Sequence, residues 1–122
     1  MRKILTVDDS TSMRQMVRAT LQSAGYDVVE AADGQDALEF ARTNAVDLVI
    51  SDVNMPRMDG ITLVGELRCL PAYRLTPLLL LTTESSQEKK LEGKRAGATG
   101  WIVKPFNPTQ LLSTLNKLFG TA

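Results

Sequence analysis

The stretch Pro77-Leu78-Leu79-Leu80-Leu81-Thr82 sets four consecutive leucines between a proline and a threonine. A strand with one face in water alternates apolar and polar residues, whereas an unbroken apolar run of this length is typical of a strand buried on both faces. Such strands occur in parallel sheets whose two faces are covered by helices. The leucine run therefore predicts an inner strand of a parallel α/β sheet.

The rest of the chain alternates short apolar segments with segments of helical spacing. Four more strands are expected, at residues 3–7, 27–30, 48–52 and 101–103, and the second is polar enough to be an edge strand. Glycine is expected to end two helices, at Gly25 and Gly97. Asn107 should cap the last helix, and Ser85 with Glu88 forms a capping-box pattern before the helix that ends at Gly97.

Five successive βα units predict an open parallel sheet with helices on both faces. A complete eight-fold barrel needs roughly 200 residues or more, and this chain has 122. We therefore expect one domain over residues 1–122. Its class is α/β, a flavodoxin-like doubly wound (βα)5 sandwich with a five-stranded sheet of order 2-1-3-4-5.

Composition narrows the chemistry and the partners. The formal net charge is +0, so no global field favours nucleic acid or an anionic membrane. The single cysteine, Cys69, cannot form an internal disulfide, and the N-terminus lacks a signal-peptide core, which together predict a cytoplasmic protein. The chain contains no histidine, which excludes a Ser-His-Asp triad and histidine-bound zinc.

Three aspartates follow the first and third predicted strands. Asp8 and Asp9 come after the first strand, and Asp52 ends the third. In the order 2-1-3-4-5 these strands are neighbours, and ligands bind at the carboxyl ends of such strands. Packed carboxylates repel one another, and Mg²⁺ relieves that repulsion by accepting oxygen ligands. Considered singly, Asp8 or Asp9 fits better as a cap of the following helix, and it is the convergence of three carboxylates that favours a metal site.

Two further polar side chains end the fourth and fifth predicted strands. Thr82 and Lys104 are expected to point into the same crevice as the aspartates. A hydroxyl and an ammonium beside a metal-bound carboxylate suit a phosphoryl group, with Asp52 as the nucleophile. Taken alone, Lys104 would be an exposed charge at a strand end, and Thr82 a strand-end or capping hydroxyl.

These residues together resemble a known family, the response-regulator receiver domains. The resemblance rests on Val7-Asp8-Asp9, Asp52-Val53-Asn54-Met55-Pro56-Arg57-Met58-Asp59-Gly60, Thr82 and Lys104-Pro105-Phe106, and it spans the whole chain. Among receivers the chain is most similar to the CheY-type single-domain chemotaxis regulators.

The resemblance implies a phosphorylation switch rather than an enzyme with an external substrate. Asp52 would accept phosphate from a CheA-like histidine kinase. Asp9 and Asp52 would ligate Mg²⁺ through their side chains, Asn54 through its main-chain carbonyl and Asp8 through water. Lys104 would contact the phosphoryl group and Thr82 would move to bond it. The Lys104–Pro105 peptide bond would be cis.

The resemblance also implies an output surface, with one departure from the family pattern. Trp101 stands where receivers usually have tyrosine or phenylalanine, and it could equally be a core tryptophan. With Lys89 and Lys90 it would form the face that binds a protein effector such as the flagellar motor switch. The lysine-bearing helix could also be merely solvated. Asn54 and Glu84 would modulate dephosphorylation, a phosphatase is a further partner, and the protein would be a monomer.

Three alternatives stay open on the sequence alone. A phosphate sink or phosphorelay intermediate would share the site but have no motor effector. A Mg²⁺-dependent phosphohydrolase would also use Asp52 or Asp8, although its usual first-strand pattern is Asp-x-Asp rather than adjacent aspartates. A flavin-binding electron carrier would share the topology, but its first loop needs hydroxyl and backbone donors where this chain has carboxylates.

Overall fold

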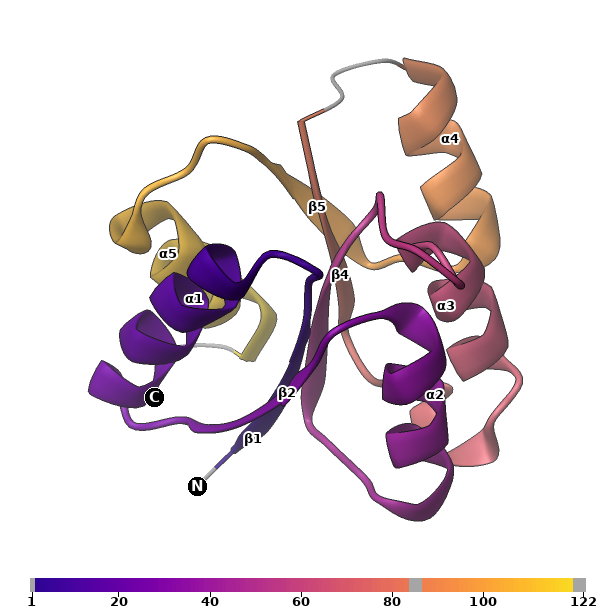
Figure 1. Cartoon of the computed structure of the whole chain (residues 1–122), viewed down its shortest axis with the longest axis horizontal. Coiled ribbons are helices and arrows are strands. Elements are labelled where there is room, and N and C mark those ends of the chain that lie inside the picture. The colour runs from indigo at the N-terminus through magenta and orange to yellow at the C-terminus, as the bar shows by residue number, and fades with distance from the viewer. Residues whose placement is uncertain (1, 84–86, 120–122) are drawn as a thin grey trace.

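The structure is a computed structural model that describes residues 2–83 and 87–119 (Figure 1). Strands and helices alternate along the chain, as the sequence predicts. The elements in order are β1 (Lys3–Val7), α1 (Thr11–Ser23), β2 (Asp27–Ala31), α2 (Gly34–Thr43), β3 (Leu48–Asp52), α3 (Gly60–Arg68), the 3-10 helix η1 (Pro71–Tyr73), β4 (Leu78–Thr82), α4 (Gln87–Ala96), β5 (Gly100–Val103) and α5 (Pro108–Phe119).

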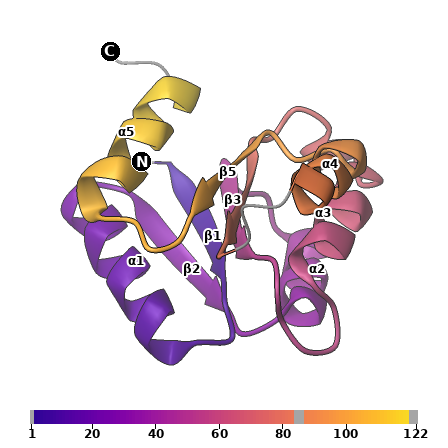
Figure 2. The ribbon, with the colours of Figure 1, turned by 90° about the horizontal axis from the view of Figure 1, so that it is seen from above.

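The five strands form one parallel sheet of order β2-β1-β3-β4-β5. Helices α1 and α5 cover one face, and α2, α3 and α4 cover the other, as Figures 1 and 2 show from two directions. The predicted doubly wound fold and the predicted edge position of β2 are therefore confirmed.

The leucine run of β4 divides its side chains between the two faces. Leu78 and Leu80 pack in the core beneath α2 and α3, while Leu79 and Leu81 pack in the core beneath α1 and α5. Every residue of β4 is buried. The strand lacks apolar–polar alternation because both of its faces are buried, as expected for an inner strand of a parallel sheet.

Strand register brings the predicted polar residues to one edge of the sheet. Val7 of β1 lies opposite Ser51, so the residues that follow β1 stand beside Asp52 at the end of β3. Asp52 in turn lies opposite Leu81, next to Thr82 at the end of β4.

Helix ends follow the predicted local chemistry. Gly25 and Gly97 have φ values of +94° and +112°, a region that glycine enters without a Cβ clash. Asn107 Oδ1 accepts the Gln110 N–H at 2.8 Å, and Gln110 Oε1 accepts the Asn107 N–H at 2.9 Å, which completes a capping box for α5. The expected cap at Ser85 lies outside the described residues. The short η1 helix was not predicted.

Among the described residues, no helix is both long and apolar enough to cross a membrane.

Candidate functional site

Three carboxylates converge at the carboxyl ends of β1 and β3. Asp8, Asp9 and Asp52 each offer an oxygen, and these oxygens all lie within 4.8 Å of one another. Asp8 and Asp52 are buried, whereas Asp9 is exposed. The predicted acidic cluster is therefore present, and its hard oxygen donors fit a magnesium ion.

Asp8 is fixed by the first turn of α1. Its Oδ1 accepts the Ser10 N–H at 2.9 Å, and its main-chain carbonyl accepts a bond from the Arg14 guanidinium. Glu30 on β2 holds Arg14 in turn, with 3.3 Å between Nε and Oε1. The cap of α1 is Ser10, whose hydroxyl accepts the Met13 N–H. The capping alternative for Asp8 and Asp9 is therefore wrong.

Lys104 links two of the three carboxylates. Its Nζ lies 3.1 Å from Asp52 Oδ1 and 3.5 Å from Asp8 Oδ2. The lysine side chain is only 13% exposed, so the alternative of an exposed strand-end charge is wrong. The Lys104–Pro105 peptide bond is cis, as the resemblance implies.

The environment of Asp52 favours its neutral form. Burial raises the pKa of Asp52 above its ordinary value of 3.8, and the charge of Asp8 adds to the rise, while the bond from Lys104 opposes it. Asp52 Oδ1 also accepts the Val53 N–H at 2.9 Å. Relative to the unfolded chain, the folded protein therefore disfavours the ionised form of Asp52.

We expect Asp52→Asn to stabilise the protein in a pH-dependent way when measured in EDTA. Well below pH 3.8 the aspartate is protonated in folded and unfolded chains alike, so the variant and the native protein should differ little. As pH rises through the raised folded pKa, the native protein loses stability that the variant keeps. Urea unfolding from pH 3 to pH 7 measures this difference, and a constant difference across the range would contradict the assignment.

Thr82 lines a small hollow against α4. This hollow is lined by Val53, Leu80, Thr82, Lys89, Lys90 and Trp101. Trp101 is partly buried against the core, and Lys90 Nζ lies 5.5 Å from the centre of its ring. Trp101 is thus neither wholly core nor wholly surface, and Thr82 and Lys90 are its neighbours.

The remaining predicted residues lie around the site. Asn54 is exposed on the loop between β3 and α3, two residues after Asp52. Lys89 is exposed on α4 and pairs with Glu92 at 3.6 Å. Helix α4 is largely exposed, in keeping with its polar sequence. Glu84 lies outside the described residues.

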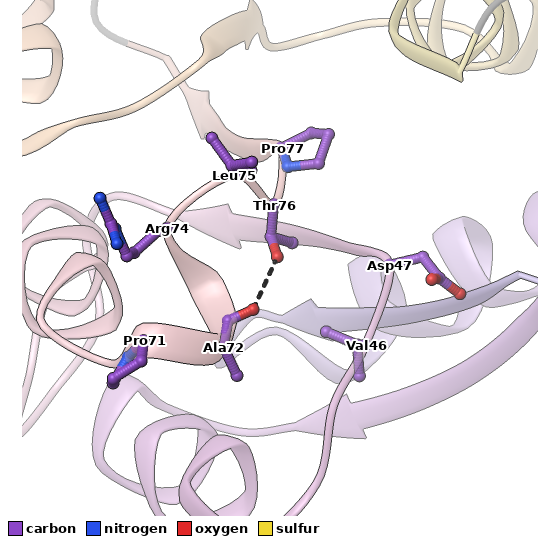
Figure 3. A pocket seen from close by; sticks show the side chains of 8 residues that line it. All are labelled: Val46, Asp47, Pro71, Ala72, Arg74, Leu75, Thr76 and Pro77. Atoms are coloured by element: carbon purple, nitrogen blue, oxygen red, sulfur yellow. Dashed lines mark hydrogen bonds between the residues drawn. The ribbon is translucent and has the colours of Figure 1, made fainter.

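A larger hollow lies at the opposite end of the sheet. It has a volume of about 650 Å³ and is open to solvent, between η1 and the starts of β3 and β4 (Figure 3). Leu75 on its rim is 96% exposed. Its lining residues precede their strands, whereas the acidic cluster follows its strands. This hollow is therefore separate from the aspartates.

Arg57 is a site neighbour that the sequence reasoning did not single out. It lies on the loop after β3 and pairs with Asp33 and Asp36 at the start of α2. The sequence alone shows that two carboxylates, Asp33 and Asp36, stand three residues apart at the start of α2, where a cation could pair with both. Only the tertiary structure shows that an arginine from another loop reaches them.

Comparison with known proteins agrees with this geometry. The family model for the response regulator receiver domain matches residues 4–116. The chemotaxis protein CheY1 of Helicobacter pylori is 39% identical over 121 residues, covering 98% of both chains.

Solved structures give the same result. The chemotaxis response regulator CheY4 of Vibrio cholerae is 58% identical, with a TM-score of 0.93 over 97% of this chain and 98% of that chain. The receiver domain of a sensor histidine kinase from Pseudomonas aeruginosa is 29% identical, with a TM-score of 0.91 over 98% of both chains. It is described with a magnesium ion coordinated in its active-site cleft. The chain therefore belongs to the response regulator receiver domain family of two-component signalling.

Proposed function

We propose that this chain is a phosphorylation-activated response regulator of chemotaxis, in which Asp52 accepts a phosphoryl group from a CheA-like histidine kinase. The observation that carries the proposal is the Lys104 ammonium, held between Asp52 and Asp8 inside a cluster of three carboxylates. A largely covered cation facing several acidic oxygens suits a site that must accept a further anion. The names of the CheY relatives support chemotaxis as the pathway.

The proposed reaction transfers a phosphoryl group between the two proteins. Lys104 and the Val53 N–H both contact Asp52 Oδ1, so we assign Oδ2 as the nucleophile. A bond forms between Oδ2 and the phosphorus of a phosphohistidine, and the P–N bond breaks with its electron pair remaining on the imidazole. The chain has no histidine, so the donor imidazole belongs to the kinase.

The carboxylate cluster fits Mg²⁺ as the cofactor. Asp9 and Asp52 would hold the ion through side-chain oxygens, Asn54 through its main-chain carbonyl and Asp8 through water. When bound, the ion would neutralise charge that accumulates on the phosphoryl oxygens. The magnesium described in the Pseudomonas aeruginosa receiver supports this choice of metal.

Lys104 and Thr82 would act on the phosphorylated state. Lys104 would exchange part of its contact with Asp52 for a phosphoryl oxygen, and the Thr82 hydroxyl would move to donate a hydrogen bond to another. Asn54 and Glu84 would influence dephosphorylation, with or without a phosphatase. Receiver domains are signalling switches, so we do not propose the phosphohydrolase or the flavin carrier.

Output is proposed to pass through protein contact. Thr82 shares a hollow with Lys89, Lys90 and Trp101, which gives a direct path from the site to the α4–β5 surface. We propose that a monomeric single receiver domain, residues 1–122, binds an effector such as the flagellar motor switch in the cytoplasm, and does not bind nucleic acid or membrane. A phosphate sink would share this site but would lack phosphorylation-dependent binding.

Incubation with acetyl phosphate and Mg²⁺ tests the proposed phosphorylation. The native protein is expected to gain the mass of one phosphoryl group, and EDTA should prevent the gain. Asp52→Asn should show none, while Asp27→Asn, which changes an exposed aspartate at the far end of β2, should behave like the native chain. No gain by the native protein, or an equal gain by Asp52→Asn, would refute the proposal.

A further inference from the structure

Arg57 holds an unusual backbone conformation in the loop that joins β3 to α3. Its φ is +66°, and it is the only described residue other than glycine with positive φ. The Met58 N–H donates to the Pro56 carbonyl at 2.7 Å, which closes a three-residue turn around Arg57. Residues other than glycine rarely adopt this region, so the turn needs contacts from outside the loop to hold it.

The guanidinium of Arg57 supplies those contacts at the start of α2. Its Nε lies 2.8 Å from Asp33 Oδ2 and its Nη2 lies 3.1 Å from Asp33 Oδ1, a two-pronged bond. Nη2 also lies 2.8 Å from Asp36 Oδ1. Asp33 is buried and caps α2 through the Asp36 N–H, and the bond from Arg57 lowers the pKa of Asp33. The loop is therefore attached to the capped start of α2.

The backbone makes a second attachment beside the first. The Gly34 N–H donates to the Met58 carbonyl at 3.3 Å. A Cβ on Gly34 would lie 2.5 Å from that carbonyl oxygen, so the loop packs directly against the first residue of α2. The loop that carries Asn54 is thus fixed at Arg57 and at Met58.

We propose that Arg57 is a positioning residue for the divalent-cation site, acting by fixing the loop that carries Asn54, whose main-chain carbonyl is the proposed loop ligand of the ion. The inference rests on the proposed function, since it assigns Arg57 a part in Mg²⁺ binding. Arg57 does not contact the ion. It acts through its bonds to Asp33 and Asp36, which set where residues 53–58 lie relative to the cluster.

Simple electrostatics and positioning predict opposite outcomes for removal of Arg57. A positive charge near the site repels Mg²⁺, so its loss should strengthen cation binding if charge alone mattered. If Arg57 positions the loop, its loss should weaken binding, because one oxygen ligand is no longer held in place. Loss of partners that orient metal ligands typically weakens metal affinity by about ten- to a hundredfold.

Calorimetric titration with Mg²⁺ at fixed ionic strength distinguishes the two. Arg57→Asn keeps a residue that tolerates positive φ but removes the guanidinium. We expect its Mg²⁺ dissociation constant to rise about tenfold. Arg42→Gln removes the same charge from the exposed end of α2 and should leave the constant unchanged or slightly lower. Arg57→Lys keeps the charge but lacks the guanidinium that bonds two oxygens at once. Its Mg²⁺ dissociation constant should lie between those of Arg57→Asn and the native protein.

The dependence of phosphorylation on Mg²⁺ gives a second readout. If Arg57 serves cation binding, saturating Mg²⁺ should restore the acetyl phosphate reaction of Arg57→Asn to the native rate, and a lasting defect would contradict the positioning role. Unchanged or tighter Mg²⁺ binding by Arg57→Asn would overturn this inference and leave the proposed function standing. Absence of Mg²⁺ binding by the native protein would overturn both.

Discussion

Replacing Lys104 by methionine is expected to lower the free energy of unfolding by about 3 kcal/mol at neutral pH in EDTA. The methionine keeps much of the volume of the lysine stem but leaves Asp8 and Asp52 without the ammonium that lies 3.5 Å and 3.1 Å from them. Both carboxylates are buried, so water cannot replace the lost partner fully. The pKa of Asp52 should rise further, and its protonation limits the loss.

Magnesium should restore part of the stability that Lys104→Met loses, and this distinguishes a defect at the acidic cluster from general destabilisation. Without the ammonium the cluster is more negative, so Mg²⁺ should stabilise Lys104→Met more than it stabilises the native protein. Urea unfolding with EDTA and with Mg²⁺ measures both effects. Lys104→Arg keeps the charge and should lose less stability than Lys104→Met. Lys94→Met changes an exposed lysine on α4 and should leave the free energy of unfolding nearly unchanged. Equal losses for Lys94→Met and Lys104→Met would contradict the assigned contacts.

Much of the site was predictable because the relevant information is local or periodic. The leucine run at 78–81 fixes a doubly buried strand, and alternation of strands with helices fixes a parallel sheet. Parallel strands end together, so side chains that follow different strands meet at one edge. Asp8, Asp9 and Asp52 are brought together for that reason, and this needs no knowledge of side-chain packing.

The contacts that hold the site were not predictable, because they join segments distant in sequence. Arg57 follows a proline in the loop after β3. Nothing local indicates that its backbone adopts a φ of +66° or that its side chain reaches Asp33. Arg68 shows the same limit. From the sequence, Arg68 is explained as a positive charge that interacts favourably with the end of a helix. In the structure its guanidinium also donates to the carbonyls of Tyr73, Thr76 and Gly97.

Trp101 falls between these two cases. Its place on the last strand followed from the sequence, since Trp101-Ile102-Val103 reads as a strand and β5 includes it. Its partial burial and the lysine above its ring depend on how α4 packs against the sheet. A polar helix with few apolar residues gives little periodicity from which to predict that packing.

Replacing Gly60 by alanine should be among the most destabilising single changes at the site, with a loss of about 3 kcal/mol in the free energy of unfolding. A Cβ at Gly60 would lie 2.1 Å from the main-chain oxygen of Asp52 and 3.1 Å from Ser51 Oγ. The main-chain oxygen belongs to a paired strand, and the Gly60 N–H is bonded to the Val53 carbonyl at 2.9 Å. Neither side can withdraw without breaking the turn that follows Asp52.

Gly65, in the same helix, provides a matched control. Beyond its chain neighbours and the backbone of its own helix, no atom lies within 4 Å of a Cβ built there. Gly65→Ala therefore adds helix propensity without a clash and should stabilise the protein by about 0.5–1 kcal/mol. Urea unfolding of both variants separates the clash from any general effect of alanine in α3. Because the clash in Gly60→Ala falls on Asp52 itself, phosphorylation by acetyl phosphate should fall even under conditions where the variant is fully folded. A folded Gly60→Ala variant with native stability and native phosphorylation would show that the close approach of α3 to β3 does not hold the proposed phosphoacceptor in place.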